Sequence, residues 1–309
     1  IVSQYQGIKN QLDKNSEILY SKGCNINDTD ISGFGEAIAT AKAADVVILS
    51  LGEAADMSGE AKSRSSLQLP GVQEELMKEI YKTGKPIVLL LNTGRPLIFN
   101  WAADNIPAIL YTWWLGTEAG NSIADVVFGD YNPAGKLPMS FPRTEGQIPI
   151  YYNHYSTGRP AKDENDKNYV SAYIDLQNSP RFPFGYGLSY TNFNISDLKL
   201  SSTELAINGG KLTVTVDVKN AGDYDGEEVV QLYVRDLYGC VVRPVKELKG
   251  FKKLFLKKGE TQSVSFTLTA TDLKFYNDEV KFINEAGDYE LFVGNSSDAN
   301  LKSKFKLTL

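Results

Sequence analysis

The sequence predicts an α/β sandwich, a mostly parallel sheet with helices on both faces, followed by an all-β sandwich. Through the first half of the chain, continuous apolar segments of strand length alternate with segments of helical period, which is typical of a covered parallel sheet. In the last third, short segments alternate apolar and polar residues between turns, which is typical of an antiparallel sandwich. The length of 309 residues fits two such domains at roughly 150 residues each.

The α/β part begins with an amphipathic helix around Ile8 and Leu12. The elements expected after it are a strand at Glu17–Tyr20, a helix at Gly33–Ala44, a strand at Val46–Leu51, a helix at Gly71–Thr83, strands at Lys85–Asn92 and Ala108–Trp113, and a helix at Ala119–Phe128. Because parallel strands end at one edge of their sheet, a ligand crevice is expected outside those carboxyl ends. The residues that follow each strand are therefore where we expect a site.

A connector rich in Tyr, Pro, Asn and Gly separates the two parts and shows neither helical nor strand period. Its aromatic content argues against disorder, since such rings need a surface to pack on. We therefore predict an α/β domain over residues 1–145, a connector over 146–192 and the β-sandwich over 193–309. The clearest strands of the sandwich are Lys211–Lys219, Val229–Arg235, Thr261–Thr267 and Asp288–Val293.

Composition excludes several classes of function. With 32 Lys plus Arg against 38 Asp plus Glu, the net charge of −6 argues against nucleic acid or an anionic membrane as partner. No apolar segment approaches the roughly 20 residues of a membrane span. One His (His154) and two Cys (Cys24 and Cys240), which we expect to be unpaired, nearly exclude a zinc site, and we expect neither metal nor cofactor. Chemistry in this chain must therefore depend on carboxylates.

Residues 116–138 read GTEAGNSIADVVFGDYNPAGKLP, and this segment resembles the second domain of glycoside hydrolase family 3, the exo-acting β-glucosidases and β-xylosidases. Further similar segments are GKP at 84–86, GRP at 94–96, FGYGLSY at 184–190 and RPVKELKGF at 243–251. The last of these resembles part of the fibronectin type III-like domain that follows in many members. The likeness is greatest to the bacterial periplasmic β-glucosidase type. It implies a β-linked oligosaccharide or glucoside as substrate and a periplasmic or secreted location.

Enzymes of this family carry an N-terminal (β/α)8 barrel that supplies the catalytic nucleophile, an Asp. The present chain begins at Ile1, inside the second domain, so the resemblance implies a fragment that lacks the barrel and its nucleophile. We therefore expect the missing barrel to be a partner of this chain and the chain alone to be inactive. The alternatives are a stand-alone carbohydrate-binding protein and a purely structural module that mediates homodimerisation.

Retaining glycoside hydrolysis needs two carboxyl groups about 5–5.5 Å apart, one as nucleophile and one as acid and then base. A loop with several carboxylates follows the strand Val46–Leu51 at its carboxyl end. Family members place the acid/base on this loop in a Gly-Glu-x-x-x-Arg context, which implies Glu60 as acid/base here, unless the barrel supplies that group. Glu53 is the second choice, although we favour for it the role of a buried, hydrogen-bonded residue at the strand end.

Three further residues are candidates for binding the sugar. Arg64 either contacts a sugar hydroxyl or pairs with Glu60. Trp113 and Trp114 lie at the end of a predicted strand, and their rings either stack on the apolar face of a pyranose or pack against the protein.

Overall fold

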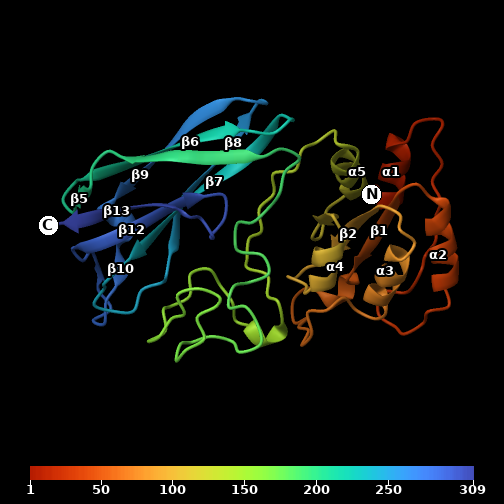
Figure 1. Cartoon of the computed structure of the whole chain (residues 1–309), viewed down its shortest axis with the longest axis horizontal. Helices are drawn as coiled ribbons and strands as arrows, with labels where there is room; N and C mark the ends of the chain where they lie inside the picture. Colours follow the sequence, from red (N-terminus) through yellow and green to blue (C-terminus); the bar gives the residue numbers. More distant parts are fainter. The chain divides into compact units, whose positions relative to one another are not determined.

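The computed structural model describes residues 1–309, and the chain divides into two compact units (Figure 1). The first unit comprises Ile1–Tyr131 and Pro142–Ile148, and the second comprises Asn132–Phe141 and Pro149–Leu309. The two units therefore interleave along the sequence. The division into three segments at residues 145 and 192 stays a prediction.

A three-stranded parallel sheet forms the centre of the first unit, in the order β1 (Val47–Gly52), β2 (Ile87–Asn92), β3 (Ala108–Tyr111). The central strand β2 contributes three consecutive leucines that are fully buried, Leu89 to Leu91. A strand covered on both faces has no side for polar residues, which is why these segments read as continuous apolar runs.

Five helices accompany the sheet, and they confirm the predicted α/β architecture. They are α1 (Gln4–Gln11), α2 (Phe34–Ala43), α3 (Gln73–Tyr81), α4 (Asn100–Asn105) and α5 (Ala119–Phe128). The segments α3 and α4 connect adjacent parallel strands, as crossover helices do. The helix α1 packs against α5, and α2 packs against α3.

Two details of the prediction need correction. Residues 17–20 form no strand, because they pair with no neighbouring strand and a strand exists only within a hydrogen-bonded ladder. The helix α4 is not among the predicted elements, because its six residues make too few turns to show an amphipathic period. The two cysteines, Cys24 and Cys240, are free, as predicted. None of the helices is long and apolar enough to cross a membrane.

The contact between α1 and α5 depends on two glycines. A Cβ atom on Gly7 would lie 2.0 Å from the carbonyl oxygen of Gly120, and one on Gly120 would lie 2.0 Å from that of Ser3. The backbone of Val2 adds hydrogen bonds at this contact, accepting from the Gly120 N–H at 3.0 Å and donating to the Thr117 carbonyl at 2.8 Å. Here backbone meets backbone, so no side chain can move aside to make room.

We predict that Gly120→Ala destabilises the first unit by about 1–3 kcal/mol, the usual cost of forcing an extra carbon into a packed contact. Trp fluorescence during chemical denaturation measures this, because Trp101, Trp113 and Trp114 all belong to this unit. Gly35→Ala in α2 is the matched control, since a Cβ there meets nothing within 4 Å. An unchanged denaturation midpoint for Gly120→Ala would contradict the close approach.

The second unit contains a sandwich of two sheets, as predicted, and all their strand pairs are antiparallel except the pair β5 and β13. One sheet has the order β5-β13-β12-β7-β8 and the other β4-β6-β9, with a small β10-β11 pair beside them. Their strands are β4 (Phe193–Leu200), β5 (Glu204–Ala206), β6 (Lys211–Asn220), β7 (Gly226–Asp236), β8 (Glu247–Leu256), β9 (Thr261–Thr269), β10 (Phe275–Tyr276), β11 (Phe282–Ile283), β12 (Gly287–Gly294) and β13 (Leu301–Thr308). In β6, Leu212, Val214, Val216 and Val218 alternate with more exposed residues and are fully buried. The period of two thus places one face of each strand in a common core.

Two loop segments of the second unit pair with each other and dock on β7. Residues 132–141 and 181–190 exchange backbone hydrogen bonds, for example between Leu137 N–H and the Tyr186 carbonyl at 2.8 Å. We call this pair of segments the docked arm. Its attachment to β7 is a buried ion pair of 2.7 Å between Lys136 Nζ and Glu228 Oε1, together with a 3.2 Å hydrogen bond from Gln231 to the Gly185 carbonyl.

Candidate active site

A loop of residues 54–68 leaves β1 at its carboxyl end, at the edge of the sheet where β2 and β3 also end. Residues 93–95 follow β2 at this edge, and Trp113 and Trp114 follow β3. This is the edge where the order of the elements predicts a ligand crevice. The loop begins with a short 3₁₀ turn, η1 (Ala55–Met57).

Glu53 lies at the root of the loop and is 4% exposed. Its Oε1 accepts a hydrogen bond of 2.6 Å from Arg64 Nη1 and lies 2.9 Å from Arg95 Nε. Its Oε2 accepts a hydrogen bond of 2.5 Å from Thr93 Oγ1. The carboxylate is therefore matched by two guanidinium groups and a hydroxyl, which is what a buried charge requires.

Burial alone raises the pKa of Glu53, but the hydrogen bonds from Thr93 and Arg64 and the charge of Arg95 outweigh it, so the pKa is lowered. The ionised form contributes stability that is present above the pKa of Glu in the unfolded chain and is lost as pH falls through the lower folded value. A general acid must instead hold a proton at working pH. Glu53 is thus buried and hydrogen-bonded at the strand end, as the favoured expectation has it, and whether it has a part in catalysis stays a prediction.

Glu60 occupies the tip of the loop. A bridge between Gly59 and Lys62, with a 3.1 Å hydrogen bond from Lys62 N–H to the Gly59 carbonyl, makes a tight hairpin with Glu60 and Ala61 at its end. Ala61 has φ 58° and Gly59 has φ 144°, so the turn uses two left-handed conformations. Glu60 is exposed, and its side chain makes no ion pair or hydrogen bond within the chain. The alternative in which Arg64 pairs with Glu60 is wrong, because Arg64 pairs with Glu53.

The two tryptophans at the end of β3 have different surroundings. Trp113 has φ 56°, a rare conformation for a bulky residue, and its ring meets that of Tyr111 edge-to-face at 4.9 Å. Trp114 is 45% exposed. A Cβ on Gly94 would lie 2.5 Å from Trp114 Nε1 and 2.1 Å from Ser58 Oγ, so both side chains lie against the Gly94 backbone. The structure therefore brings Trp114 next to the carboxylate loop.

Thr93 and Arg95 have roles at this site that were not expected from the sequence. Besides its ion pair with Glu53, Arg95 donates a hydrogen bond through Nη2 to the carbonyl of Met57 on the loop. The available signal is the position of both residues directly after β2, where polar side chains reach the same sheet edge as Glu53. His154, by comparison, is exposed and its Nδ1 lies 3.0 Å from the Tyr155 carbonyl oxygen.

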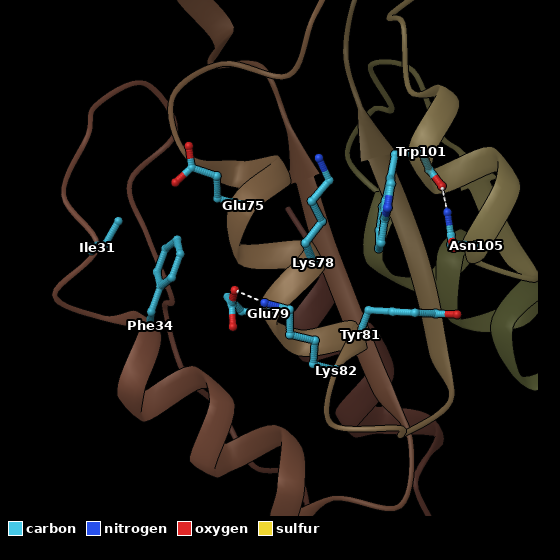
Figure 2. Close-up of a pocket in the computed structure, with 9 residues that line it drawn as sticks. All are labelled: Ile31, Phe34, Glu75, Lys78, Glu79, Tyr81, Lys82, Trp101 and Asn105. Carbon is cyan, nitrogen blue, oxygen red and sulfur yellow. Dashed lines mark hydrogen bonds and ion pairs between the residues drawn. The ribbon is translucent and has the colours of Figure 1, made fainter.

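A groove of about 690 Å³ lies elsewhere on the first unit, along α3. Figure 2 shows Ile31 and Phe34 on one side of this helix and Trp101 on the other, with the Glu79–Lys82 ion pair on the helix itself. No residue of the loop 54–68 lines the groove. The groove and the carboxylate loop are therefore separate features.

Two family models match the chain. Residues 1–190 match the model described as "Glycosyl hydrolase family 3 C-terminal domain", and residues 228–297 match the one described as "Fibronectin type III-like domain". The second match agrees with the observed β-sandwich.

Curated relatives include a periplasmic β-glucosidase of Salmonella typhimurium, 44% identical over 99% of this chain, and a β-xylosidase of Formosa agariphila, 45% identical over the whole chain. In each case the match covers 42% of the relative. Among solved structures, a β-glucosidase from Listeria innocua in complex with laminaribiose has a TM-score of 0.92 and 40% identity, over 100% of this chain and 42% of that one. The chain thus spans less than half the length of the proteins it matches.

Proposed function

The chain belongs to glycoside hydrolase family 3, and from that premise we propose that it forms the carboxyl-terminal portion of an exo-acting retaining β-glycosidase. The proposed reaction is hydrolysis of terminal, non-reducing β-D-glucosyl residues, by analogy with relatives named as β-glucosidases. A relative named as a β-xylosidase makes the xyloside the main alternative substrate. The name of the Salmonella relative supports a periplasmic location.

We assign the acid/base role to Glu60. The observation that carries this assignment is an exposed carboxylate without a partner at the tip of a hairpin, on the loop that leaves β1 at the expected crevice. A group that donates and later accepts a proton must reach the substrate and must not be held in a permanent ion pair. The exposure of Glu60 and its lack of an ion pair support this assignment, whereas the carboxylate of Glu53 is buried between two arginines.

In the proposed mechanism, the Glu60 carboxyl donates its proton to the glycosidic oxygen as the bond to the anomeric carbon breaks. The family's nucleophile, an Asp of the N-terminal barrel, forms the glycosyl-enzyme bond on the opposite face. Two carboxyl groups about 5–5.5 Å apart disfavour a double negative charge, so one of the pair retains a proton. In the second step Glu60, now ionised, removes a proton from the water that releases the sugar.

Trp114 is the proposed platform for the sugar. Its ring is 45% exposed and lies against Gly94 beside the loop, so one aromatic face is free for the C–H groups of a pyranose. Trp113 and Arg64 are weaker candidates, since the ring of Trp113 packs on Tyr111 and the guanidinium of Arg64 is bound to Glu53.

Comparing the purified chain with the full-length protein tests this function. We predict that the full-length protein hydrolyses 4-nitrophenyl β-D-glucoside and that the chain alone does not, because one of two cooperating catalytic groups is absent. Release of nitrophenolate, measured for the glucoside and the xyloside, also decides between the two sugars. Turnover by the chain alone in the usual enzymatic range of about 1–1000 per second would contradict the proposal, because it would require a nucleophile among these 309 residues.

A further inference from the structure

The Glu53 carboxylate attaches both arms of the loop 54–68 to the sheet. On the outgoing arm, Arg95 bridges Glu53 and the Met57 carbonyl. On the returning arm, Arg64 binds Glu53 through Nη1 and the Gln68 carbonyl through Nη2 at 3.1 Å. One buried carboxylate thus connects two guanidinium groups that each hold a different arm.

The tip of the loop has no comparable attachment. Within the returning arm, Glu145 Oε1 accepts hydrogen bonds from Leu67 N–H at 3.0 Å and Ser66 Oγ at 3.2 Å, which fix the end of the loop. Between Met57 and Arg64, the hairpin is closed by its own bridge from Gly59 to Lys62, and Ser58 at its base lies against the backbone of Gly94. The place and direction of the tip therefore follow from where its two arms are held.

We propose that Glu53 is a positioning residue for the acid/base Glu60: its buried carboxylate, through Arg64 and Arg95, fixes both arms of the hairpin that presents Glu60 to the glycosidic oxygen. This inference rests on the proposed function. Glu53 touches neither substrate nor reacting atoms and acts only through the two arginines.

Removing the charge of Glu53 has a defined consequence. Two guanidinium groups, with side chains only 20% and 13% exposed, then lose their common anion and repel each other. Arg64 lies on the loop and can turn toward solvent, which frees the returning arm as far as Arg64, while Ser66 and Leu67 stay bound to Glu145. A displacement of about 1 Å from productive geometry costs a reaction about 100-fold, and the loss falls on proton transfer, since that is the step Glu60 performs.

The test uses the full-length protein and the variant Glu53→Gln, which keeps the shape of the side chain. Two substrates are compared: phenyl β-D-glucoside, whose leaving group needs a proton, and 2,4-dinitrophenyl β-D-glucoside, whose leaving group does not. We expect kcat/KM to fall about 100-fold for the phenyl glucoside and only a few-fold for the dinitrophenyl glucoside. Azide, which needs no general base, is expected to raise kcat for the dinitrophenyl glucoside and to yield the glycosyl azide.

Glu228→Gln is the matched control, because Glu228 is also a buried, ion-paired glutamate but belongs to the second unit. It is expected to lower stability while leaving the ratio of the two kcat/KM values unchanged. An equal loss on both substrates for Glu53→Gln, or no loss on either, would overturn the positioning role. Should Glu53→Gln not fold, Arg64→Met is judged by the same criteria.

Glu60→Gln separates this inference from the function on which it rests. If Glu60→Gln shows the selective loss on the phenyl glucoside and Glu53→Gln does not, only the positioning role is wrong. If Glu60→Gln itself shows no selective loss, the acid/base assignment is wrong.

Discussion

Replacing Glu60 by Ala in the full-length protein is expected to lower kcat/KM for substrates with poor leaving groups by about 10²–10⁴-fold, the usual contribution of general acid–base catalysis. The variant can neither protonate the departing oxygen nor activate the attacking water. For 2,4-dinitrophenyl β-D-glucoside the first step needs no proton, so glycosylation is expected to continue. The second step still needs a base, so the covalent glycosyl-enzyme is expected to accumulate and to be visible by mass spectrometry.

Chemical rescue identifies the missing group in this variant. Azide attacks the glycosyl-enzyme without losing a proton, so it is expected to restore turnover and give the β-glycosyl azide with retained configuration. Glu36→Ala on α2 is a suitable control, because Glu36 is likewise exposed and without a partner but lies away from the loop. A Glu60→Ala enzyme that cleaves a disaccharide at the wild-type rate would remove Glu60 from the mechanism, and the same rescue would then be applied to carboxylates of the barrel.

The predicted fold agrees with the structure wherever one local pattern determines the element. The central strand β2 is a continuous apolar run because both its faces are covered, and β6 alternates because only one of its faces is buried. The segment 17–20 has the composition of a strand, but no neighbour in the structure offers a ladder to it. Strand formation is a property of pairs of segments, and a single segment does not reveal its partner.

At the candidate site, too, a residue's partners in the fold cannot be identified from its neighbours in sequence. The loop after β1 and the place of Glu60 on it follow from element order and from the family resemblance. The partners of Glu53 do not, because Arg64 and Arg95 are 11 and 42 positions away along the chain. Proximity in sequence offers Glu60, four residues before Arg64, as one possible partner of this arginine. In the structure Arg64 instead forms its ion pair with the buried carboxylate of Glu53. A charge removed from water gains more from pairing than an exposed one.

Two of the segments that carry the family resemblance contribute residues to the docked arm of the second unit. Residues 132–138 and 184–190 of these segments lie in the docked arm, in which Lys136 pairs with Glu228 and the Gly185 carbonyl accepts a hydrogen bond from Gln231. A Cβ on Gly185 would lie 2.2 Å from the Gln231 side-chain oxygen, so a glycine is needed at that close approach, where φ is 80°. Residues 132–138 and 184–190 therefore belong to the second unit and act there by packing and hydrogen bonding, whereas residues 116–131, which include α5, belong to the first unit.

The Lys136–Glu228 ion pair makes the largest single contribution to stability that we predict. The side chains are 11% and 4% exposed, and Lys136 Nζ also donates to the Gly187 carbonyl at 2.8 Å. Glu228 accepts further hydrogen bonds from Val229 N–H at 2.7 Å and Asn295 Nδ2 at 3.2 Å. Both charges are thus fully matched in the fold, and neither can return to water without breaking the docked arm.

Lys136→Met is expected to lower the free energy of unfolding of the second unit by about 3–5 kcal/mol, because it leaves the Glu228 charge buried without its counter-ion. Since all three tryptophans belong to the first unit, native-state hydrogen exchange of amides in β6 and β7 is the appropriate measurement. Adding Glu228→Gln to Lys136→Met removes the stranded charge and is expected to restore a large part of the loss. Lys258→Met is the matched control, because its ion pair with Asp223 has the same 2.7 Å separation but lies at 59% and 81% exposure, so exchange should hardly change. Equal effects of Lys136→Met and Lys258→Met on hydrogen exchange would contradict this prediction, because burial would then add nothing to the stabilisation by the Lys136–Glu228 pair. The docked arm would in that case be held by its backbone hydrogen bonds alone.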